Sequence, residues 1–354
     1  MTASPLISCI VVNWNRRELL RACLDSLAMH QDYPNREIIV VDNGSTDGSV
    51  ELCEKLAAES AAGDSGETVR LIRNRENRGF CAANNQGIAA ARGEFVALLN
   101  NDAEAEPGFL GALLRVFEGR PDVGMAAAKI VVWEDPGMID KAGHLIYPDG
   151  QNRGRGTGER DHGQFDRVEE VLWPDGCAAM YRKSMLDEIG GFDEDFFAYA
   201  DDAELGLRAR IAGWNCLYTP HAVARHHRGS TLGLASVRRL RLIERNRVLL
   251  AVKLFPWSLL LLNKFYYACR LMAGIFAAAR GEGETALFPG FAGKLKLMAG
   301  LMLGDLSALL LIPRMLMKRV ALRRLRKLTG SEIRELILQH RIPLRDLTAK
   351  AAIR

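Results

Sequence analysis

Short apolar runs alternate with segments of helical periodicity between residues 6 and 130, and no other feature of the sequence limits the fold more strongly. Four of these runs are too short for ordinary helices and are typical of strands covered on both faces: LISCIVV, EIIVV, VRLI and FVALL. The first segment between them has apolar residues at i, i+3, i+4 and i+7, namely Leu20, Cys23, Leu24 and Leu27. Repeated β-α-β units of this kind predict a doubly wound, mostly parallel α/β sheet.

Capping residues predict where several of the helices begin or end. Asn15 is a candidate N-cap for the first helix, and Asp47 is a candidate for the second. Pro107 suits the first turn of the helix that follows FVALL. Gly213 is a natural stop for the helix predicted in DDAELGLRARIAGW.

Residues 134 to 170 lack this regularity and are rich in Gly, Asp and Arg. The spacing of Gly154, Gly156 and Gly158 matches part of a dinucleotide-binding motif, but these glycines neither follow a predicted strand nor open a helix. We therefore expect a flexible surface loop in this segment.

Composition and cysteine usage are typical of an intracellular globular protein. With 354 residues, 48% of them hydrophobic and 25% charged, the chain can bury a large core and should form one large domain or two. The seven cysteines are scattered and include no CxxC pair, which argues against a zinc site or a disulfide framework. The N-terminal stretch MTASPLISCIVVNWN lacks the basic and long apolar regions of a signal peptide. We therefore expect a cytoplasmic location.

Charge is divided unevenly along the chain, since residues 1 to 237 carry a net −12 and residues 238 to 354 a net +16. A basic tail of this kind predicts contact with a polyanion, either nucleic acid or an anionic membrane surface. The arginines of the tail alternate with aliphatic residues and lack aromatic residues for base stacking. We therefore expect a membrane surface and no nucleic acid.

The tail from residue 246 to 354 also contains long apolar stretches with helical character, at 249–279 and 295–312. Charged residues interrupt both stretches, and the uncharged runs fall short of the ~20 residues that a spanning helix needs. Trp257, Tyr266 and Tyr267 suit an interfacial position. We expect helices that lie in the membrane surface. The alternative is a helical subdomain that packs on the rest of the chain or on a second subunit, as in a homo-oligomer.

Carboxylates follow several of the predicted strands. They are Asp42 after EIIVV, Asp102 after FVALL, Asp175 in WPDG, and Asp201, Asp202 and Glu204 in DDAEL. Because the loops that follow parallel strands meet at the carboxyl edge of a sheet, where nucleotides and phosphates bind, we expect these groups to converge there.

Asp102, which ends the polar run after FVALL, is a candidate ligand for a divalent metal. Mg²⁺ and Mn²⁺ prefer oxygen ligands and often combine one or two carboxylates with substrate phosphates. His226 or His227 could complete the site or bind phosphate, and strand alternation points only one of them inward. An anion site is favoured by their polar neighbours, Arg228, Ser230 and Thr231.

Six motifs in a fixed order resemble glycosyltransferase family 2: VVNWN, VVDNGSTDGS, NRENRGFCAANNQGI, ARGEFVALLNNDAE, the stretch from WPDGCAAMYR to ARIAGW, and HHRGST. The likeness covers roughly residues 5 to 250 and is closest to bacterial rhamnosyltransferase-like members that build cell-surface polysaccharides. It implies the A-type glycosyltransferase fold, with a catalytic domain at 1–245 followed by a helical, membrane-associating extension at 246–354. The nucleotide-binding part would be about 1–133 and the acceptor part about 134–245, with acceptor specificity expected within 134–175.

The resemblance also implies roles for individual residues. The nucleotide would contact Val12, Asn13, Asp42, Asn77, Gly79, Asn84 and Asn101. The metal would be held by Asp102, which matches the last Asp of the family's DxD motif, and by His226. Asp202 matches the catalytic base, with support for the base and the acceptor from Asp201, Glu204 and Asp175. This sequence departs from the family at Asn100 and Asn101, and it has Asp-Asp-Ala-Glu where Glu-Asp-x-Asp is usual.

The implied function is that of an inverting glycosyltransferase that moves a sugar, with rhamnose expected, from a dTDP- or UDP-sugar to a lipid-linked or cell-surface glycan acceptor. Asp202 would deprotonate the acceptor hydroxyl, and Mg²⁺ or Mn²⁺ at Asp102 would stabilise the departing diphosphate. The enzyme would be peripheral on the inner face of the cell membrane. Two alternatives stay open: a catalytically silent nucleotide-sugar-binding partner in a polysaccharide assembly complex, and a sugar-phosphate nucleotidyltransferase. The second would need a Gly-rich loop after the first strand, which WNRRELL does not provide.

Overall fold

All four apolar runs of the N-terminal half form strands in the computed structural model, which describes residues 4–29, 33–62, 68–227, 236–280 and 287–349. They are β1 (Ile7–Asn13), β2 (Arg36–Asp42), β3 (Thr68–Arg73) and β4 (Phe95–Leu99). These strands pair in parallel in the order β4-β1-β2-β3, as the alternation predicted. Almost every side chain of β1, β2 and β4 is buried, which explains their continuous apolar character.

The rest of the large sheet is mixed in direction. It consists of β5 (Ala103–Ala105), β6 (Val123–Val132), β7 (Ile139–Lys141), β10 (Glu169–Glu170), β11 (Ala178–Arg182) and β12 (Asn215–His226). The strand order is β10-β12-β6-β11-β4-β1-β2-β3, with β5 on β12 and β7 on β6. β11 runs antiparallel to both neighbours because the chain returns from β6 without a crossover helix, which a parallel pair would need. The predicted α/β class is confirmed, and the sheet is mixed.

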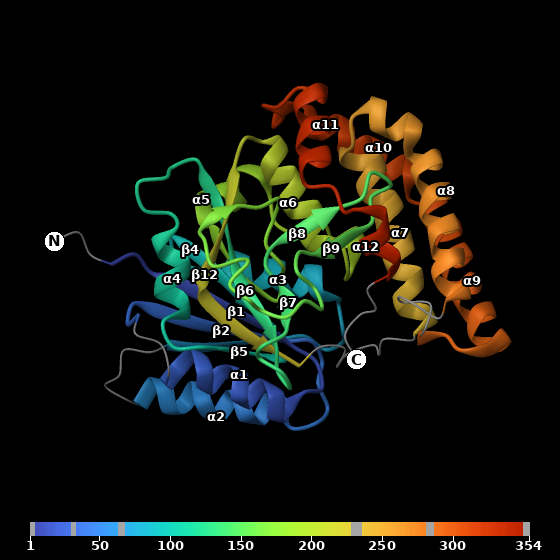
Figure 1. Cartoon of the computed structure of the whole chain (residues 1–354). Helices are drawn as coiled ribbons and strands as arrows, with labels where there is room; N and C mark the ends of the chain where they lie inside the picture. Colours follow the sequence, from blue (N-terminus) through green and yellow to red (C-terminus); the bar gives the residue numbers. More distant parts are fainter. Residues whose placement is uncertain (1–3, 30–32, 63–67, 228–235, 281–286, 350–354) are drawn as a thin grey trace.

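Helices cover both faces of this sheet (Figure 1). One face packs on α1 (Arg17–Met29), α2 (Ser49–Ala62) and α4 (Phe109–Arg115). The other packs on α3 (Phe80–Ala90), α5 (Lys183–Ile189), α6 (Asp201–Ile211) and α7 (Val237–Leu254). The strands supply alternate side chains to the two cores, as Cys9 and Ile10 of β1 illustrate. The carboxyl ends of the parallel strands are thereby left free for a site.

The predicted capping residues have mixed outcomes. Asn15 has a positive φ and accepts a hydrogen bond from the Thr46 amide, so it is not the N-cap of α1. Asp47 accepts hydrogen bonds from the amides of Arg17 and Ser49 and so serves the starts of both α1 and α2. Pro107 lies outside α4, whose N-cap is Gly108. Gly213 follows α6 with a φ of 84°, which confirms the predicted stop.

The expectation of a flexible loop at 134–170 is wrong. This segment contains β7, the hairpin of β8 (His144–Ile146) with β9 (Asn152–Gly154), and β10. Asp140, His144 and Asp149 within it are buried. Polar residues that bind one another inside the protein give the same composition as a solvated loop, which is why composition misled the prediction.

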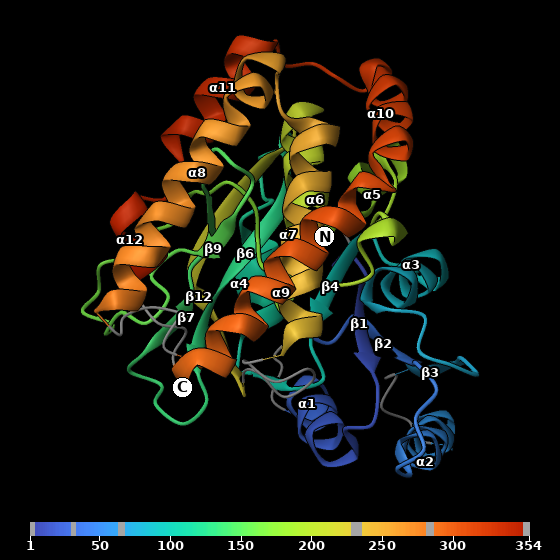
Figure 2. The ribbon, with the colours of Figure 1, turned by 90° about the vertical axis from the view of Figure 1, so that its right-hand side faces the viewer.

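The C-terminal region consists of helices that stack beside the sheet domain. After α7 come α8 (Trp257–Ala279), α9 (Gly290–Leu309), α10 (Ile312–Ala321), α11 (Gly330–Gln339) and α12 (Leu344–Ala349). Short 3-10 turns lie at Glu194–Phe196 (η1) and Leu322–Arg324 (η3). The boundary expected between residues 245 and 246 falls within α7, and the second half of α7 belongs to the main core through Leu249, Leu250 and Phe255 just after it. Figures 1 and 2 show α8 and α9 as the outermost layer, on the side away from α1 and α2.

Candidate active site

A cavity of about 1130 Å³ opens at the carboxyl ends of β1 and β4 and continues towards α8 and α9. It brings together nine residues that the sequence had singled out: Val12, Asn77, Gly79, Asn101, Asp102, Asp175, Asp201, Asp202 and His226. The remaining predicted residues, Asn13, Asp42, Asn84 and Glu204, are buried behind its walls.

The end of β1 is held by a chain of hydrogen bonds behind the predicted nucleotide site. Asn101 donates from Nδ2 to Asn13 Oδ1 at 2.7 Å, and Asn13 donates from Nδ2 to Asp42 Oδ2 at 3.0 Å. Asp42 Oδ1 accepts from the amides of Gly44 and Ser45. Asn13 and Asp42 therefore fix the loops that carry Val12 and Asn101 to the cavity.

A second loop closes the same side of the cavity. Asn43 Nδ2 donates to Asn77 Oδ1 and to the Gly79 carbonyl. Gly79 has a φ of 88°, and a Cβ there would come within 2.5 Å of the Phe197 ring, so only glycine fits at this position. Asn84 lies within α3 and donates to the Phe80 carbonyl. Trp14, which the sequence reading did not select, also lines the cavity and offers a flat apolar face beside Val12.

Asp102 and His226 face each other at one end of the cavity. His226 Nε2 lies 3.4 Å from Asp102 Oδ1, while its Nδ1 lies 2.8 Å from Asp140 Oδ2. Burial alone would lower the pKa of His226, but Cys177, Asp102 and Asp140 raise it well above the ordinary value. With Asp140 holding Nδ1, Nε2 faces the carboxylate of Asp102, and the two could bind a divalent cation together once Nε2 gives up its proton to the solvent.

The choice between the two histidines is settled by their surroundings. His226 is buried and lines the cavity. His227 stacks on the Trp133 ring, with 4.3 Å between ring centroids, and its Nε2 lies 3.9 Å from Glu104 Oε1. The neighbours expected to form an anion site, Arg228, Ser230 and Thr231, lie outside the described residues.

A cluster of carboxylates occupies the middle of the cavity, around Lys141 and His144. Lys141 Nζ lies 2.5 Å from Asp175 Oδ2, and His144 Nε2 lies 2.8 Å from the same oxygen and 3.7 Å from Asp202 Oδ2. His144, Asp175 and Asp202 each offer a ligand atom within 4.8 Å of the others, which makes them a second group that could hold a metal ion. Burial lowers the pKa of His144 to about 4, so its ring is neutral near pH 7.

Asp201 and Asp202 begin α6, where the helix dipole favours an ionised carboxylate. Burial nevertheless raises the pKa of Asp201 to about 7. Burial, followed by the nearby charges of Asp175 and Asp201, raises the pKa of Asp202 well above its ordinary value. Lys141 acts in the opposite direction on both. The three carboxylates can carry more negative charge than the one ammonium group of Lys141 neutralises, so the cluster would favour a further positive charge.

Glu204 differs from the other acids of its cluster. Its carboxylate is fully buried and accepts hydrogen bonds from Nε and Nη2 of Arg208, and Lys253 Nζ lies 2.6 Å from it. Although burial would raise the pKa of Glu204, these cations keep it below the ordinary value. This side chain ties α6 to α7.

The segment just before α6 is held in a rare backbone conformation. Phe197, Tyr199 and Ala200 all have positive φ angles, of 64°, 69° and 54°. Asn246 of α7, fully buried, donates from Nδ2 to the carbonyls of Phe196, Ala198 and Tyr199 at 2.7 to 2.9 Å. The position of Asp201 and Asp202 therefore depends on the C-terminal region.

Four residues important to this arrangement were missed from the sequence: Asp140, Lys141, His144 and Asn246. The first three lie in the segment expected to be a flexible loop, and the string IDKAGH was a usable signal because it combines acid, base and imidazole within a few residues. Asn246 gave no signal, since an isolated Asn in a basic helix resembles a solvated residue.

Comparison with known proteins adds three findings. A family model described as glycosyl transferase family 2 matches residues 8–190. The Sinorhizobium fredii protein y4gI is 30% identical over 247 residues, which are 66% of this chain and 26% of that protein. The O-antigen biosynthesis protein RfbC of Myxococcus xanthus is 28% identical over 240 residues, 64% of this chain and 18% of that one. The chain thus spans about a quarter or less of these two relatives.

An N-acetylglucosaminyl-diphospho-decaprenol L-rhamnosyltransferase of Mycobacterium tuberculosis is 27% identical over 251 residues, 65% of this chain and 78% of that enzyme. Among solved structures, the mannosyltransferase PcManGT of Pyrobaculum calidifontis, in complex with GDP-Man and Mn²⁺, aligns with a TM-score of 0.54 and 20% identity over 87% of this chain and 88% of its own. GalNAc-T7 with UDP, GalNAc and Mn²⁺ aligns with a TM-score of 0.58 and 15% identity over 77% of this chain and 51% of its own. These structures share the fold.

Proposed function

Because the chain belongs to glycosyltransferase family 2 and is a glycosyltransferase, we propose that it transfers a sugar, with rhamnose expected, from a dTDP- or UDP-sugar to a lipid-linked glycan, with inversion at the anomeric carbon. The observation that carries this proposal is the single cavity in which Asp102 and His226 lie at one end and Asp202 lies among Asp175, Lys141 and His144. A nucleotide-sugar needs both a place for its diphosphate and a base near its reacting carbon.

We assign the base to Asp202. It lines the cavity, whereas Glu204 is occupied by Arg208 and Lys253. Burial and the adjacent carboxylates strengthen its affinity for a proton, as a base that accepts the proton of an acceptor hydroxyl requires. Lys141 and His144 keep Asp175 in place beside it, because both bind the same oxygen of Asp175.

Asp102 and His226 are proposed to hold Mg²⁺ or Mn²⁺ together with the donor diphosphate, and Asp140 orients the imidazole of His226. A divalent ion bound there would neutralise negative charge on the leaving diphosphate. Because the run Asn100-Asn101-Asp102 supplies one carboxylate, we expect metal and nucleotide to bind together more strongly than either alone.

Metal-dependent nucleotide binding tests this assignment. Isothermal titration of UDP and dTDP, with Mn²⁺ or with excess chelator, should show affinity that depends on Mn²⁺ in the wild type. Asp102→Asn and His226→Gln should lose that dependence, and His227→Gln, whose ring stacks on Trp133, serves as the matched control and should retain it. If Asp102→Asn keeps Mn²⁺-dependent affinity while His144→Gln loses it, the ion is held by His144, Asp175 and Asp202 instead.

We also propose that the enzyme is cytoplasmic and peripheral on the inner face of the cell membrane. Among the described residues, α8 is the one helix long and apolar enough to cross a membrane, and α9 and α10 pass the same test only as a pair bent by 56°. α8 meets this length and hydropathy although Lys264 and Arg270 interrupt its apolar residues.

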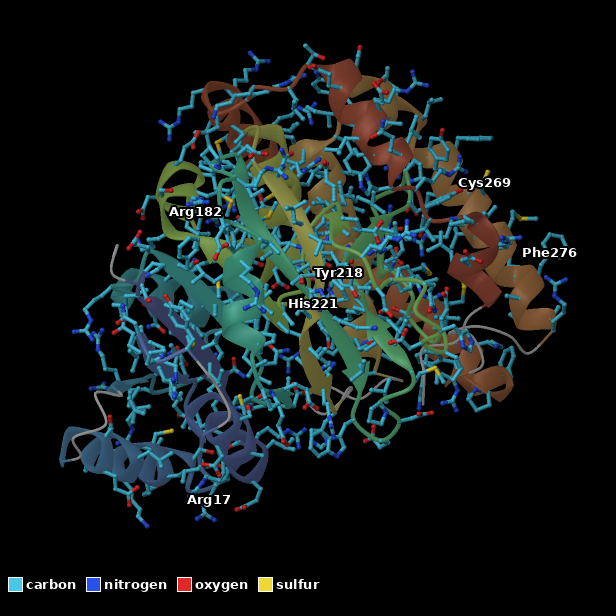
Figure 3. The ribbon with its side chains drawn as sticks, turned by 60° about the vertical axis from the view of Figure 1, so that its left-hand side comes forward. Arg17, Arg182, Tyr218, His221, Cys269 and Phe276 are labelled. Carbon is cyan, nitrogen blue, oxygen red and sulfur yellow. The ribbon has the colours of Figure 1, made fainter. Side chains whose placement is uncertain are left out.

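The contacts of α8 favour a surface position for it. Its inner face is tied to the sheet domain, since Asn263 donates to the Asp149 carbonyl and Arg270 donates from Nε to Asp149 Oδ2. Its outer face exposes large apolar side chains, among them Leu261 at 81% and Phe276 at 61%. Figure 3 shows Phe276 at the outer edge of the molecule. A helix with one face bound to protein and the other apolar is suited to lie along a bilayer. The same apolar face leaves a homo-oligomer as the alternative.

A further inference from the structure

The cavity that holds the acidic cluster does not end there, and its far part has a different chemical character. Between α7, α8 and α9 its lining becomes mainly apolar and small, with Leu271, Gly274, Ile275, Ala277, Ala278, Leu297, Met298, Leu301 and Met302. We call this part the α8–α9 groove. The parts of a nucleotide-sugar are polar, so we do not expect a nucleotide-sugar to bind in this apolar groove.

The packing of the helices keeps this groove open. α9 packs along α7, where Gly300 lies against Leu240 and Gly304 against Glu244, too close for any Cβ. α8 packs on α11 and α12 and also contacts α7, where Arg270 binds Glu244. Gly274 of α8 faces open space, since a Cβ added there would meet nothing within 4 Å. Tyr267 of α8 donates a hydrogen bond to Asp305 of α9, so the two helices are joined there, and residues of both helices line the groove.

Positive charge gathers where the groove approaches the acidic cluster. Because Gly300 adjoins Leu240 and Gly304 adjoins Glu244, α9 runs parallel to α7, which brings Lys294 near the start of α7. Arg238, Arg239 and Lys294 all line the cavity there. The guanidinium of Arg239 lies 5.7 Å from the centre of the Tyr199 ring, two residues before Asp201. Arg239 thus lies beside the segment that precedes the base, in the same cavity as the groove.

The wall beside the groove is polar but internally neutralised. Arg270 binds Glu244 and Asp149, and Arg247 binds Glu244 and Asp305. Because these two guanidinium groups bind carboxylates of α7, of α9 and of the turn between β8 and β9, they hold α7, α8 and α9 together beside the groove.

We propose that the α8–α9 groove binds the hydrocarbon chain of the acceptor lipid, with Arg238, Arg239 and Lys294 beside its diphosphate and its terminal sugar directed to Asp202. This assignment rests on the proposed function, because it names the part of the enzyme that receives the acceptor. Its basis is the continuity of an apolar groove, a cationic stretch and an acidic cluster in one cavity, which matches the order of chain, diphosphate and sugar in such a lipid. The exposed apolar outer face of α8 would give the chain access from the bilayer.

Binding of prenyl diphosphates to the full-length enzyme tests the proposal without requiring transfer. The wild type should bind geranylgeranyl diphosphate, with twenty carbons, at least ~10-fold more tightly than geranyl diphosphate, with ten, because each buried methylene adds to affinity. Gly274→Trp and Leu301→Trp fill the groove from α8 and from α9 and should abolish this preference. Ala268→Trp adds the same bulk at an exposed position of α8 outside the cavity lining and should leave it unchanged.

UDP affinity with Mn²⁺ is measured on the same samples and reports on the donor site separately, so that failure of the proposed function and failure of the groove assignment are distinguishable. Retained UDP affinity in Gly274→Trp and Leu301→Trp, with the chain-length preference lost, supports the groove. Equal binding of both prenyl diphosphates by the wild type, or an unchanged preference in both groove variants, overturns it. Displacement of geranylgeranyl diphosphate by dioctanoyl phosphatidylglycerol with equal potency also overturns it, since the groove would then hold membrane phospholipid.

Discussion

Two carboxylates two residues apart, Asp202 and Glu204, differ in almost every physical respect. Asp202 faces the cavity, whereas Glu204 is bound by Arg208 and Lys253 in the core. Spacing explains the difference: α6 turns by about 100° per residue, so residues two apart point in opposite senses. Every residue of α6 is buried. Charged groups on one side of the helix must therefore be neutralised by other protein groups, whereas the other side faces the cavity in which the ligand would bind.

Asp202→Asn should reduce transfer by at least ~10²-fold with little change in donor affinity, because a general base contributes that much to rate. Glu204→Gln is the matched comparison and should chiefly destabilise the fold by ~3 kcal/mol, since it leaves buried cations without their partner. Turnover numbers, UDP titrations and denaturant unfolding of both variants would check this. A nearly normal rate for Asp202→Asn together with an inactive Glu204→Gln would assign the base to Glu204.

Asp193 lies in the turn before α6, and its contribution to the stability of the fold has the clearest dependence on acid pH. Burial alone would raise its pKa, but the ammonium groups of Lys253 and Lys318 lower it to about 2. Because the pKa in the folded state is below the unfolded value of about 4, the stabilisation is complete above pH ~4 and is lost as the pH falls through ~2.

Asp193→Asn should therefore lower the free energy of unfolding by ~2 kcal/mol at pH 7, and the difference from wild type should shrink between pH ~4 and ~2. Urea unfolding followed by circular dichroism across this range measures it. Asp25→Asn, at a surface pair with Arg21, is the control and should change stability by no more than ~1 kcal/mol. If the difference in the free energy of unfolding between variant and wild type stays constant with pH, the charge of Asp193 does not stabilise the fold.

At the scale of elements, α7 does more than connect the sheet domain to the tail. Asn246 binds three carbonyls of the segment 196–199, whose positive φ angles would otherwise be unfavourable. η1 is held from the other side, as Lys318 and Arg314 of α10 bind Asp195. The start of α6, and with it the proposed base, is therefore set by elements that follow it in the chain.

Asn246→Ala should lower kcat by at least ~10-fold while the Mn²⁺-dependent affinity for UDP stays near wild type, because small displacements of a catalytic group are costly in rate. Val252→Ala, a buried truncation on the same helix away from the segment, should lose stability but retain kcat. Comparing kcat, the KM for donor and unfolding for both variants separates positioning from general weakening. If Asn246→Ala and Val252→Ala lose kcat to the same extent, Asn246 contributes only to the stability of the fold and does not position the base.

At the scale of the whole molecule, the uneven charge and the exposed apolar faces of α8 and α9 predict binding to anionic vesicles. Each Lys or Arg near the surface contributes ~1 kcal/mol at low salt, and the attraction weakens as salt is added. Truncation before residue 246 would also remove Asn246, so substitutions are the better test. Cosedimentation with phosphatidylglycerol vesicles should fall strongly for the triple variant Leu261→Ser, Phe265→Ser, Phe276→Ser. Val168→Ser, an exposed position of the sheet domain, should leave it unchanged.

Equal partitioning of the triple variant and the wild type would assign the apolar faces to a subunit contact. Light scattering without lipid then becomes the informative measurement, since a dimer would cover those faces.

The sequence predicted the parts of the molecule in which local pattern and final environment agree. The strands β1, β2 and β4 are almost entirely buried, as their continuous apolar runs indicate, whereas β3 lies at the edge of the sheet and is only partly buried. Asp102 and Asp202 could be located because their motifs follow a strand or open a helix. Asp140 and His144 were not predicted, although IDKAGH combines an acid, a base and an imidazole, because polar residues that pair in the interior have the same composition as solvated ones. The antiparallel direction of β11 has no local signal, because it depends on how the chain returns to the sheet after β6.

The hold of α7 and α10 on the segment before α6 bears on how enzymes of this kind can be recombined. The family model stops at residue 190, short of the strained segment, of Asn246 and of Lys318. A chimera joined at that limit would keep Asn246 and the carbonyls of residues 196–199 together from one parent. It would instead separate β12 from β6, and His226 from Asp102 and Asp140. Recombination between such enzymes should therefore preserve the segment before α6 more easily than the contacts of His226 with the N-terminal half.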